Sequence, residues 1–373
     1  MSNQRRQSRR IPGLNSLRFL AAAGVLLYHA FPVSVPGGFF GVLLFFVISG
    51  YLSAWQTLYA MENRTFSLGD YYRKRILRIY PALIIVLFSS IGVVSLVDMY
   101  RLADTPKEVL SILLGYNNIW QIKMNSSYFT NLTNTSPFTH LWYIAILLQF
   151  DLVWPLLAGV YRVLRRGLGK GAALTVFFLL TFVSFLVMPV YVLVVKDANL
   201  TAVYYHTITR VFSLFAGMFA GIMRTERLSM RSLRFRSPHT ARLSYLLFLI
   251  LTVVLYIFAR GTDLKVYLFG MQGYTILCCL MIEIMVMNHK ALQFLIDSKI
   301  STFISSLSYE IYLWQYPVLF VLGILYPEGP WYIPLLGIIL VLILSLWLHR
   351  FTGSLFSGRK KSRSTSVRSA ARA

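Results

Sequence analysis

Long apolar segments alternate with short basic segments along almost the whole chain. The apolar blocks run for about 17 to 25 residues, the length that a helix needs to cross roughly 30 Å of hydrocarbon at about 1.5 Å per residue. The blocks are 16–31, 39–59, 80–97, 141–161, 172–195, 203–222, 243–259, 266–287, 303–326 and 332–349. Strand-like alternation in ten-residue segments is not visible. The pattern predicts an all-α fold, a polytopic membrane bundle of about ten transmembrane helices.

An eleventh apolar segment, 108–122, is too short and too polar to be read in the same way. It contains Gly115, Asn117 and Asn118. We expect a re-entrant or interfacial segment, because unpaired backbone at membrane depth is tolerated only where protein surrounds it.

The distribution of charge decides between these readings. Lys and Arg number 36 against 13 Asp and Glu, a formal net charge of +23. With ten spans and the amino terminus inside, most basic residues fall in inner segments, including the loop 224–242 and the carboxyl-terminal tail, as the positive-inside rule requires. Counting 108–122 as a span would export both. The charge is therefore explained by topology, with both termini cytoplasmic, and not by nucleic-acid binding.

Composition agrees with a membrane solvent. Hydrophobic residues make up 57% of the chain, and the mean hydropathy is +0.64. We expect a basic cytoplasmic amino terminus over 1–15, a transmembrane domain over 16–351, and a basic, disordered cytoplasmic tail over 352–373. The tail is expected to lie on anionic lipid headgroups.

Ionisable residues inside apolar blocks are the first candidates for chemistry, since burying them is costly unless they are paired or face a cavity. Arg18 opens the first block and His29 follows eleven residues later, roughly 16 Å along a helix. An imidazole at that depth could serve as a general base near neutral pH. The alternative is a histidine that only makes a hydrogen bond at the helix end.

Arg75 and Arg78 lie in the segment YYRKRILRIYP, at the inner end of the third block. Three residues apart on a helix, they share a face and could clamp phosphate oxygens together. Basic residues at this position also bind lipid headgroups and set topology, which is the competing explanation.

Other polar residues are placed by the same reasoning. His206 and Arg210 are expected one turn apart on one face of the sixth span. His29, His140 and His206 lack metal-ligand spacing and nearby carboxylates, so no metal site is expected. The glycines around GGFFG and Gly50 favour close helix packing.

Five segments, in order, resemble the motifs of the acyltransferase 3 family. Arg18 and His29 match its R-x10-H pattern, GGFFGVLLFFVISGY resembles GGxxGVDxFFxxSGF, and RKRILRIYP resembles RRxxRxxP. HLWYIAILLQFDLVWP is similar to HxWSLxxExQFYxxxP, and SYEIYLWQYP to SYxxYLxHxP, a form that resembles the membrane half of Gram-positive peptidoglycan O-acetyltransferases. The likeness covers nearly the whole chain.

Four positions depart from the family pattern. Leu43 stands where many members carry Asp, Leu147 where they carry Glu, Asp151 where they carry Tyr, and Gln315 where they carry His. The usual polar roles are not assigned to these positions.

The resemblance implies an integral enzyme of the bacterial cell membrane that moves acetyl from cytoplasmic acetyl-CoA, without a metal, toward hydroxyls of a surface glycan such as peptidoglycan. Arg75 and Arg78 would hold the nucleotide end of CoA, with Arg18 as a third phosphate ligand or an anchor of the first helix. His29 would act as the base, and Arg210 would stabilise developing charge or form a structural ion pair.

Several points stay open at the level of sequence. Tyr309 and Tyr312 are either relay hydroxyls or packing residues. The extracellular SGNH-hydrolase domain usual in these relatives is not in this sequence, so the protein works alone, works with a separate partner, or is a membrane-only fragment. The alternative functions are a transporter or flippase of a lipid-linked sugar and an inactive scaffold.

Overall fold

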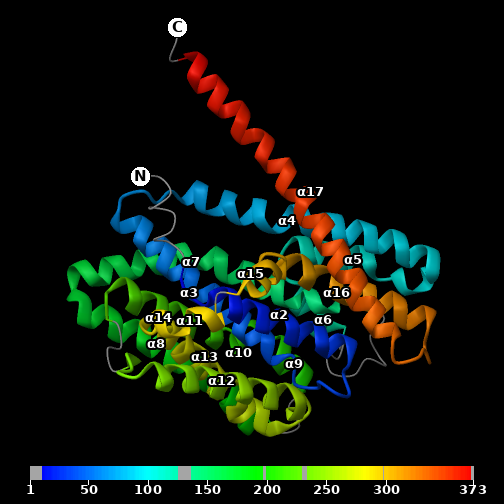
Figure 1. Ribbon diagram of the computed structural model, residues 1–373, viewed down its shortest axis with the longest axis horizontal. Helices are drawn as coiled ribbons and strands as arrows, with labels where there is room; N and C mark the ends of the chain where they lie inside the picture. The colour runs from blue at the N-terminus through cyan, green and yellow to red at the C-terminus, as the bar shows by residue number, and fades with distance from the viewer. Residues whose placement is uncertain (1–10, 125–135, 196–198, 229–232, 297, 371–373) are drawn as a thin grey trace.

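The computed structural model describes residues 11–124, 136–195, 199–228, 233–296 and 298–370, as helices packed side by side (Figure 1). The first helices are α2 (Leu14–Ala30), α3 (Phe40–Glu62), α4 (Leu68–Val97), α5 (Thr105–Leu113), α6 (Asn117–Lys123) and α7 (Trp142–Gly167). The next are α8 (Gly169–Val194), α9 (Leu200–Tyr205), α10 (Thr207–Arg210), α11 (Phe212–Thr225) and α12 (Pro238–Phe258). The last are α13 (Met271–Met287), α14 (His289–Ile296), α15 (Lys299–Ser306), α16 (Ser308–Leu325) and α17 (Ile333–Ala370). Short helical turns are η1 (Met99–Leu102), η3 (Thr139–Leu141) and η5 (Val266–Gly270). Within these ranges there is no strand, and the all-α class is confirmed.

Helix length and apolarity mark the chain as a multi-pass membrane protein. Among the described residues, seven helical segments are long and apolar enough to cross a membrane: α3, α4, η3 with α7, α8, α12, η5 with α13, and α17. Each remaining predicted span also contains helix, namely α2 with 17 residues, α16 with 18, and the interrupted series α9 to α11. The total of ten spans stays a prediction.

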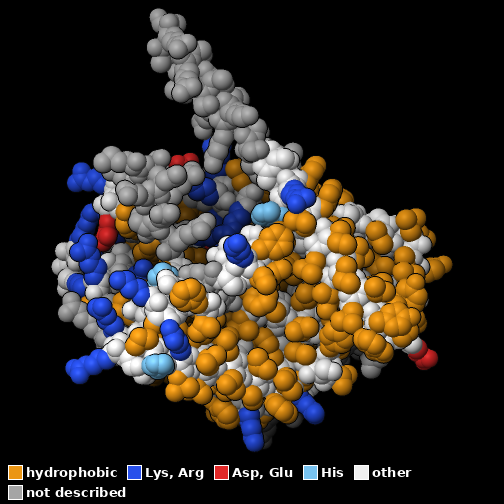
Figure 2. Space-filling view, viewed as in Figure 1, with side chains coloured by type: hydrophobic (Ala, Val, Ile, Leu, Met, Phe, Trp, Pro, Cys, Tyr) orange, Lys and Arg blue, Asp and Glu red, His pale blue; other side chains and the backbone are white. Residues whose placement is uncertain are grey.

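Basic residues in the last turns of α7 and α11 and in the first turn of α8 meet the end of α3 at one end of the bundle, which we call the basic end. Arg165 forms ion pairs with Glu62 at 3.5 Å and Glu226 at 2.6 Å. Lys170 donates to the backbone oxygen of Glu226 at 3.0 Å. Figure 2 shows Lys and Arg side chains gathered on the left of the view and a mostly hydrophobic surface on the right. The loops that the charge pattern assigns to the inside therefore lie together.

The segment 108–122 is a helical hairpin and not a span. α5 and α6 are short, and they meet at Gly115, whose φ of +76° is a left-handed conformation that favours glycine. Glu108 is buried and accepts hydrogen bonds from Gln121 at 2.8 Å and from Ser136. This confirms that the segment does not form a regular eleventh helix.

The sixth predicted span is interrupted, which corrects the expectation that His206 and Arg210 share one helical face. His206 has extended backbone and caps α10 by accepting from the backbone N–H of Ile208 at 3.2 Å. Asn118 and Gln149 stabilise the break: Asn118 donates to the carbonyl of Tyr205 at 3.0 Å, and Thr207 donates to Gln149 at 2.6 Å. These side chains replace helix hydrogen bonds that the break removes.

Glycines bring α3 and α11 into backbone contact. A Cβ on Gly50 would lie 2.0 Å from the carbonyl oxygen of Leu214, and one on Gly217 would lie 2.0 Å from that of Val47. Neither position can accept a larger residue without moving backbone. The expected packing role of the small residues in the second span is confirmed.

The ends of the chain bear on the predicted domain boundaries. Residues 1–10 lie outside the described ranges, so most of the predicted segment 1–15 does too. α17 continues through Ala370 into the segment predicted as a disordered tail, and 371–373 lie outside the description. Beyond Gly358 the sequence has neither Gly nor Pro to stop a helix.

Candidate functional site

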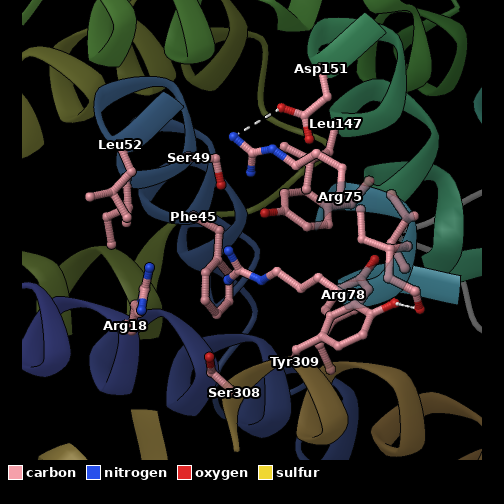
Figure 3. A pocket seen from close by; sticks show the side chains of 15 residues that line it. Arg18, Phe45, Ser49, Leu52, Arg75, Arg78, Leu147, Asp151, Ser308 and Tyr309 are labelled. Carbon is pink, nitrogen blue, oxygen red and sulfur yellow. Dashed lines mark hydrogen bonds and ion pairs between the residues drawn. The ribbon is translucent and has the colours of Figure 1, made fainter. Parts of the chain in front are cut away.

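Three arginines from two helices converge on one cavity of about 90 Å³ between α2, α3, α4, α7 and α16. Figure 3 shows Arg18 from α2 and Arg75 and Arg78 from α4 pointing into it. Arg75 and Arg78 share a face because both belong to α4, where they are three residues apart. The structure thus brings together the three residues that the sequence marks as phosphate ligands.

Arg75 is held in place by the protein. Its guanidinium donates to Ser53 Oγ at 2.7 Å and lies 3.5 Å from a carboxylate oxygen of Asp151. Tyr71 donates to the same Asp151 oxygen at 3.1 Å, and the Arg75 guanidinium stacks over the Tyr71 ring at 5.2 Å. Arg75 is therefore oriented before any ligand arrives.

Arg18 and Arg78 differ from Arg75. Within the part of the chain that the structure describes, neither guanidinium forms a hydrogen bond or an ion pair. The cavity thus holds three positive side chains against a single carboxylate, that of Asp151. Arginine guanidinium groups bind phosphate oxygens through two parallel hydrogen bonds. The unmatched positive charge is suited to an anionic ligand, and no ligand is assigned from it alone.

A second groove, of about 200 Å³, lies next to the cavity at the start of α4, and Asp70 is its one acidic lining residue among those described. Arg75 and Arg78 line both spaces, and Lys74, Ser67 and Thr57 line only the groove. A ligand with a wide anionic head and a narrow tail matches these two spaces, with the head in the groove and the tail in the cavity.

His29 lies outside the cavity, near the far end of α2. A continuous series of ring contacts connects the two. Tyr143 and Tyr312 line the cavity, with ring centroids 5.2 Å apart, and the Tyr312 ring lies 5.3 Å from His140. Tyr316 stacks on His140 at 5.2 Å and meets the His29 ring edge-on at 5.0 Å. Packed aromatic side chains therefore separate His29 from the arginines.

Tyr309 and Tyr312 use their hydroxyl groups structurally. Tyr309 donates to the carbonyl oxygen of Ile79 at 2.8 Å, and Tyr312 donates to that of His140. These bonds tie α16 to α4 and η3 while the rings line the cavity. The arrangement matches the packing reading of both residues.

Arg210 is fully buried and does not line the cavity. Its guanidinium lies 4.4 Å from the Tyr204 ring centroid and 5.4 Å from that of Trp142, and it donates to Met271 Sδ at 2.6 Å. Two aromatic faces stabilise the buried charge in a medium where water is absent. Tyr204, Phe39 and Tyr28 connect Arg210 to His29 by further ring contacts.

Two residues in or beside the site have no assigned role in the sequence analysis. Asp151, at a position that departs from the family pattern, supplies the cavity's carboxylate. His140 is almost completely buried between the cavity and His29, and neither of its ring nitrogens has a hydrogen-bond partner among the described residues. Asp151 and Leu147, which both depart from the family pattern, lie one helical turn apart and both face the cavity. This spacing was the sequence signal that could have pointed to Asp151.

Two other positions that depart from the family pattern lie in the core or beside His29. Leu43 is fully buried in the apolar core, and Gln315 is buried beside His29. No group of three His, Cys, Asp or Glu side chains in the described ranges is arranged to hold a metal ion.

Comparisons with known proteins agree on one family. Residues 11–350 match the family described as "Acyltransferase domain". The chain is 32% identical over 322 residues to YrhL of Bacillus subtilis, which is provisionally named a peptidoglycan O-acetyltransferase; the match covers 86% of this chain and 50% of that protein. It is 25% identical over 347 residues to the O-acetyltransferase OatA of Staphylococcus aureus, covering 92% of this chain and 56% of that one. The chain thus spans about half the length of these relatives. No solved structure matches it.

Proposed function

Because the chain belongs to the acyltransferase 3 family, we propose that it is a membrane O-acetyltransferase that takes acetyl from acetyl-CoA and passes it toward hydroxyl groups of a surface glycan. The observation that supports this most directly is the convergence of Arg18, Arg75 and Arg78 on one cavity that lies next to a surface groove. The transporter and flippase alternative is not favoured, because the matching family consists of acyltransferases.

The proposed donor site follows from the shape and charge of these two spaces. The phosphates of CoA lie in the groove against Lys74 and Arg78, and the narrow pantetheine arm enters the cavity beyond Arg75. The thioester then points toward Tyr143 and Tyr312 at the cavity's inner wall. Arg18 supplies a third guanidinium, either to a phosphate oxygen or to the carbonyl of the arm. No metal takes part in this proposal.

On the acceptor side, we assign His29 as the base. In the transfer, the acceptor oxygen bonds to the acetyl carbonyl carbon while the carbon–sulfur bond to CoA breaks. The hydroxyl proton passes to the imidazole, and CoA leaves as the thiol after taking up a proton. Because aromatic rings fill the space between the cavity and His29, the acetyl group reaches the acceptor only when these rings move. Arg210, among the same rings, is proposed to stabilise developing negative charge.

The relatives' names indicate the first acceptor to test, the muramic acid hydroxyls of peptidoglycan. We propose that the protein resides in a bacterial plasma membrane with the basic end and both termini in the cytoplasm. We also propose that an SGNH-type extracellular domain on a separate partner completes transfer to the glycan.

The experiment uses the full chain in lipid nanodiscs with radiolabelled acetyl-CoA and soluble peptidoglycan fragments. We expect the wild type to release CoA thiol and, when a separate SGNH-type domain is added, to label the glycan; His29→Ala should lose the glycan labelling. His239→Ala is the matched control, because His239 is exposed in the first turn of α12. Folded wild-type protein that neither releases CoA nor transfers acetyl would contradict the proposal.

A further inference from the structure

An apolar groove of about 340 Å³ runs along the membrane-embedded surface, away from the arginine cavity. Phe178, Phe182 and Phe185 of α8 form one wall, and Ala216 and Ala220 of α11 form the floor. Ile276 and Leu280 of α13 form the other wall. Phe178 and Phe182 are half exposed, so the groove opens toward lipid.

The groove is long enough to hold part of a single hydrocarbon chain. Its lining spans eight residues on each helix, from Phe178 to Phe185, from Ala216 to Met223 and from Ile276 to Glu283. At about 1.5 Å per residue, each wall is roughly 10 Å long. The small residues on the floor provide the depth, because larger side chains there would fill the space.

The two ends of the groove are different. At the end away from the basic end, η5 leads into α13 and contacts α8, so the two walls close on each other. At the basic end, the groove reaches Leu228 and Glu283. Asn288, just past α13, binds the segment between α11 and α12 there: it donates to the carbonyl of Leu233 at 2.8 Å and accepts from the N–H of Phe235 at 3.0 Å. The groove therefore opens toward lipid along its side and reaches the polar surface at the basic end.

The rim at this open end is positively charged. Arg234 and Arg236 are exposed in the segment that Asn288 binds, and Arg227 is exposed next to Leu228, which lines the groove. The one carboxylate on the groove, Glu283, accepts a hydrogen bond from Tyr51 at 3.3 Å and is offset by the nearby charge of Arg224. The arginines at this mouth thus outnumber the carboxylates among the described residues.

We propose that this groove binds one acyl chain of an anionic phospholipid from the leaflet at the basic end, with the lipid phosphate against the rim arginines. Burying the chain alone gives little selectivity, because lipid tails are as apolar as the side chains that line the groove. Selection comes from the headgroup, since Arg residues near a membrane surface attract anionic lipids. The site is independent of acetyl transfer.

The probe is phosphatidylglycerol against phosphatidylcholine with identical labelled acyl chains, offered to the full chain in mixed nanodiscs and measured by retention on the purified protein in native mass spectrometry. We expect the wild type to retain phosphatidylglycerol on the order of tenfold over phosphatidylcholine, from several arginines acting together. Reversing the rim charge with Arg227→Glu, Arg234→Glu and Arg236→Glu should abolish the preference.

Filling the groove with a larger side chain tests whether the lipid chain binds there. Ala220→Trp, or the smaller Ala220→Leu if the first does not fold, should reduce retention of both lipids severalfold. Leu247→Trp is the matched control, because Leu247 is an exposed apolar residue on α12 outside the groove. Equal retention of the two lipids by the wild type, unchanged retention in both Ala220 variants, or stronger retention of a polyprenyl phosphate would each overturn the proposal.

Discussion

Arg75 and Arg78 lie one turn apart and line the same cavity, yet the structure predicts that their removal has different consequences. Arg78 makes no hydrogen bond or ion pair within the described ranges, so Arg78→Gln should remove contacts to the ligand and leave the fold unchanged. A hydrogen bond to a charged group contributes about 1.5 to 3 kcal/mol, which corresponds to a roughly 10- to 100-fold weaker affinity for CoA.

Arg75→Gln should weaken CoA binding and also destabilise the protein. The side chain of Asp151 is only 4% exposed, whereas that of Arg75 is 21% exposed. Removing one partner of a buried ion pair costs about 3 to 5 kcal/mol, and the partial exposure of Arg75 places this pair at about 2 to 3 kcal/mol. The double variant Arg75→Gln/Asp151→Asn should recover most of that stability, because no unpaired carboxylate remains, while CoA binding stays weak.

The assay combines isothermal titration with CoA and thermal unfolding in lipid nanodiscs. Arg73→Gln is the control, since Arg73 is exposed on the same helix and does not line the cavity. If Arg78→Gln lowered the melting temperature as much as Arg75→Gln, the assignment of Arg78 as a ligand residue would be wrong. If the double variant were no more stable than Arg75→Gln, Asp151 would not be the source of the loss.

Three further predictions concern the fold. Gly217→Ala should destabilise the bundle by about 3 kcal/mol, because its Cβ would meet the Val47 carbonyl; Gly273→Ala, with open space around it, should unfold at the wild-type temperature. Burial raises the pKa of Glu108. The stability that its neutral form contributes is therefore present at low pH and is lost as the pH rises through the pKa of the folded state. Glu108→Gln should flatten the pH dependence of unfolding, and an unchanged profile would refute this. A reporter fused after Ala373 should be active only in the cytoplasm, and exterior activity would reverse the proposed sidedness.

The length of the apolar blocks was enough to predict the helical architecture, but it did not reveal where a helix breaks. The block 203–222 reads as one span, whereas its backbone is interrupted at His206. The groups that satisfy this interruption are Asn118 and Gln149, which are far from it in the sequence. Hydrophobic periodicity describes one segment at a time, so it cannot detect hydrogen bonds supplied by another helix.

The site was predictable where local spacing determines geometry. Arg75 and Arg78 share a face because helices repeat every 3.6 residues, and their approach to Arg18 came from the resemblance to a family. Asp151 was missed because its partner, Arg75, lies on another helix. The separation of His29 from the arginines was also hidden, since it depends on how rings from η3 and α16 pack against each other.

α3 connects the two sites argued from this structure. Its face with Phe45, Ser49 and Leu52 lines the arginine cavity, and Ser53 one residue later holds Arg75. On its opposite side, Tyr51 donates to Glu283 at the mouth of the lipid groove. The glycine contacts between α3 and α11 leave no room for one helix to slide without the other. A lipid in the groove can therefore alter the cavity only by moving α3 and α11 as a unit. If lipid binding moves this unit, the affinity for CoA should change with it; if it does not, the affinity for CoA should stay constant.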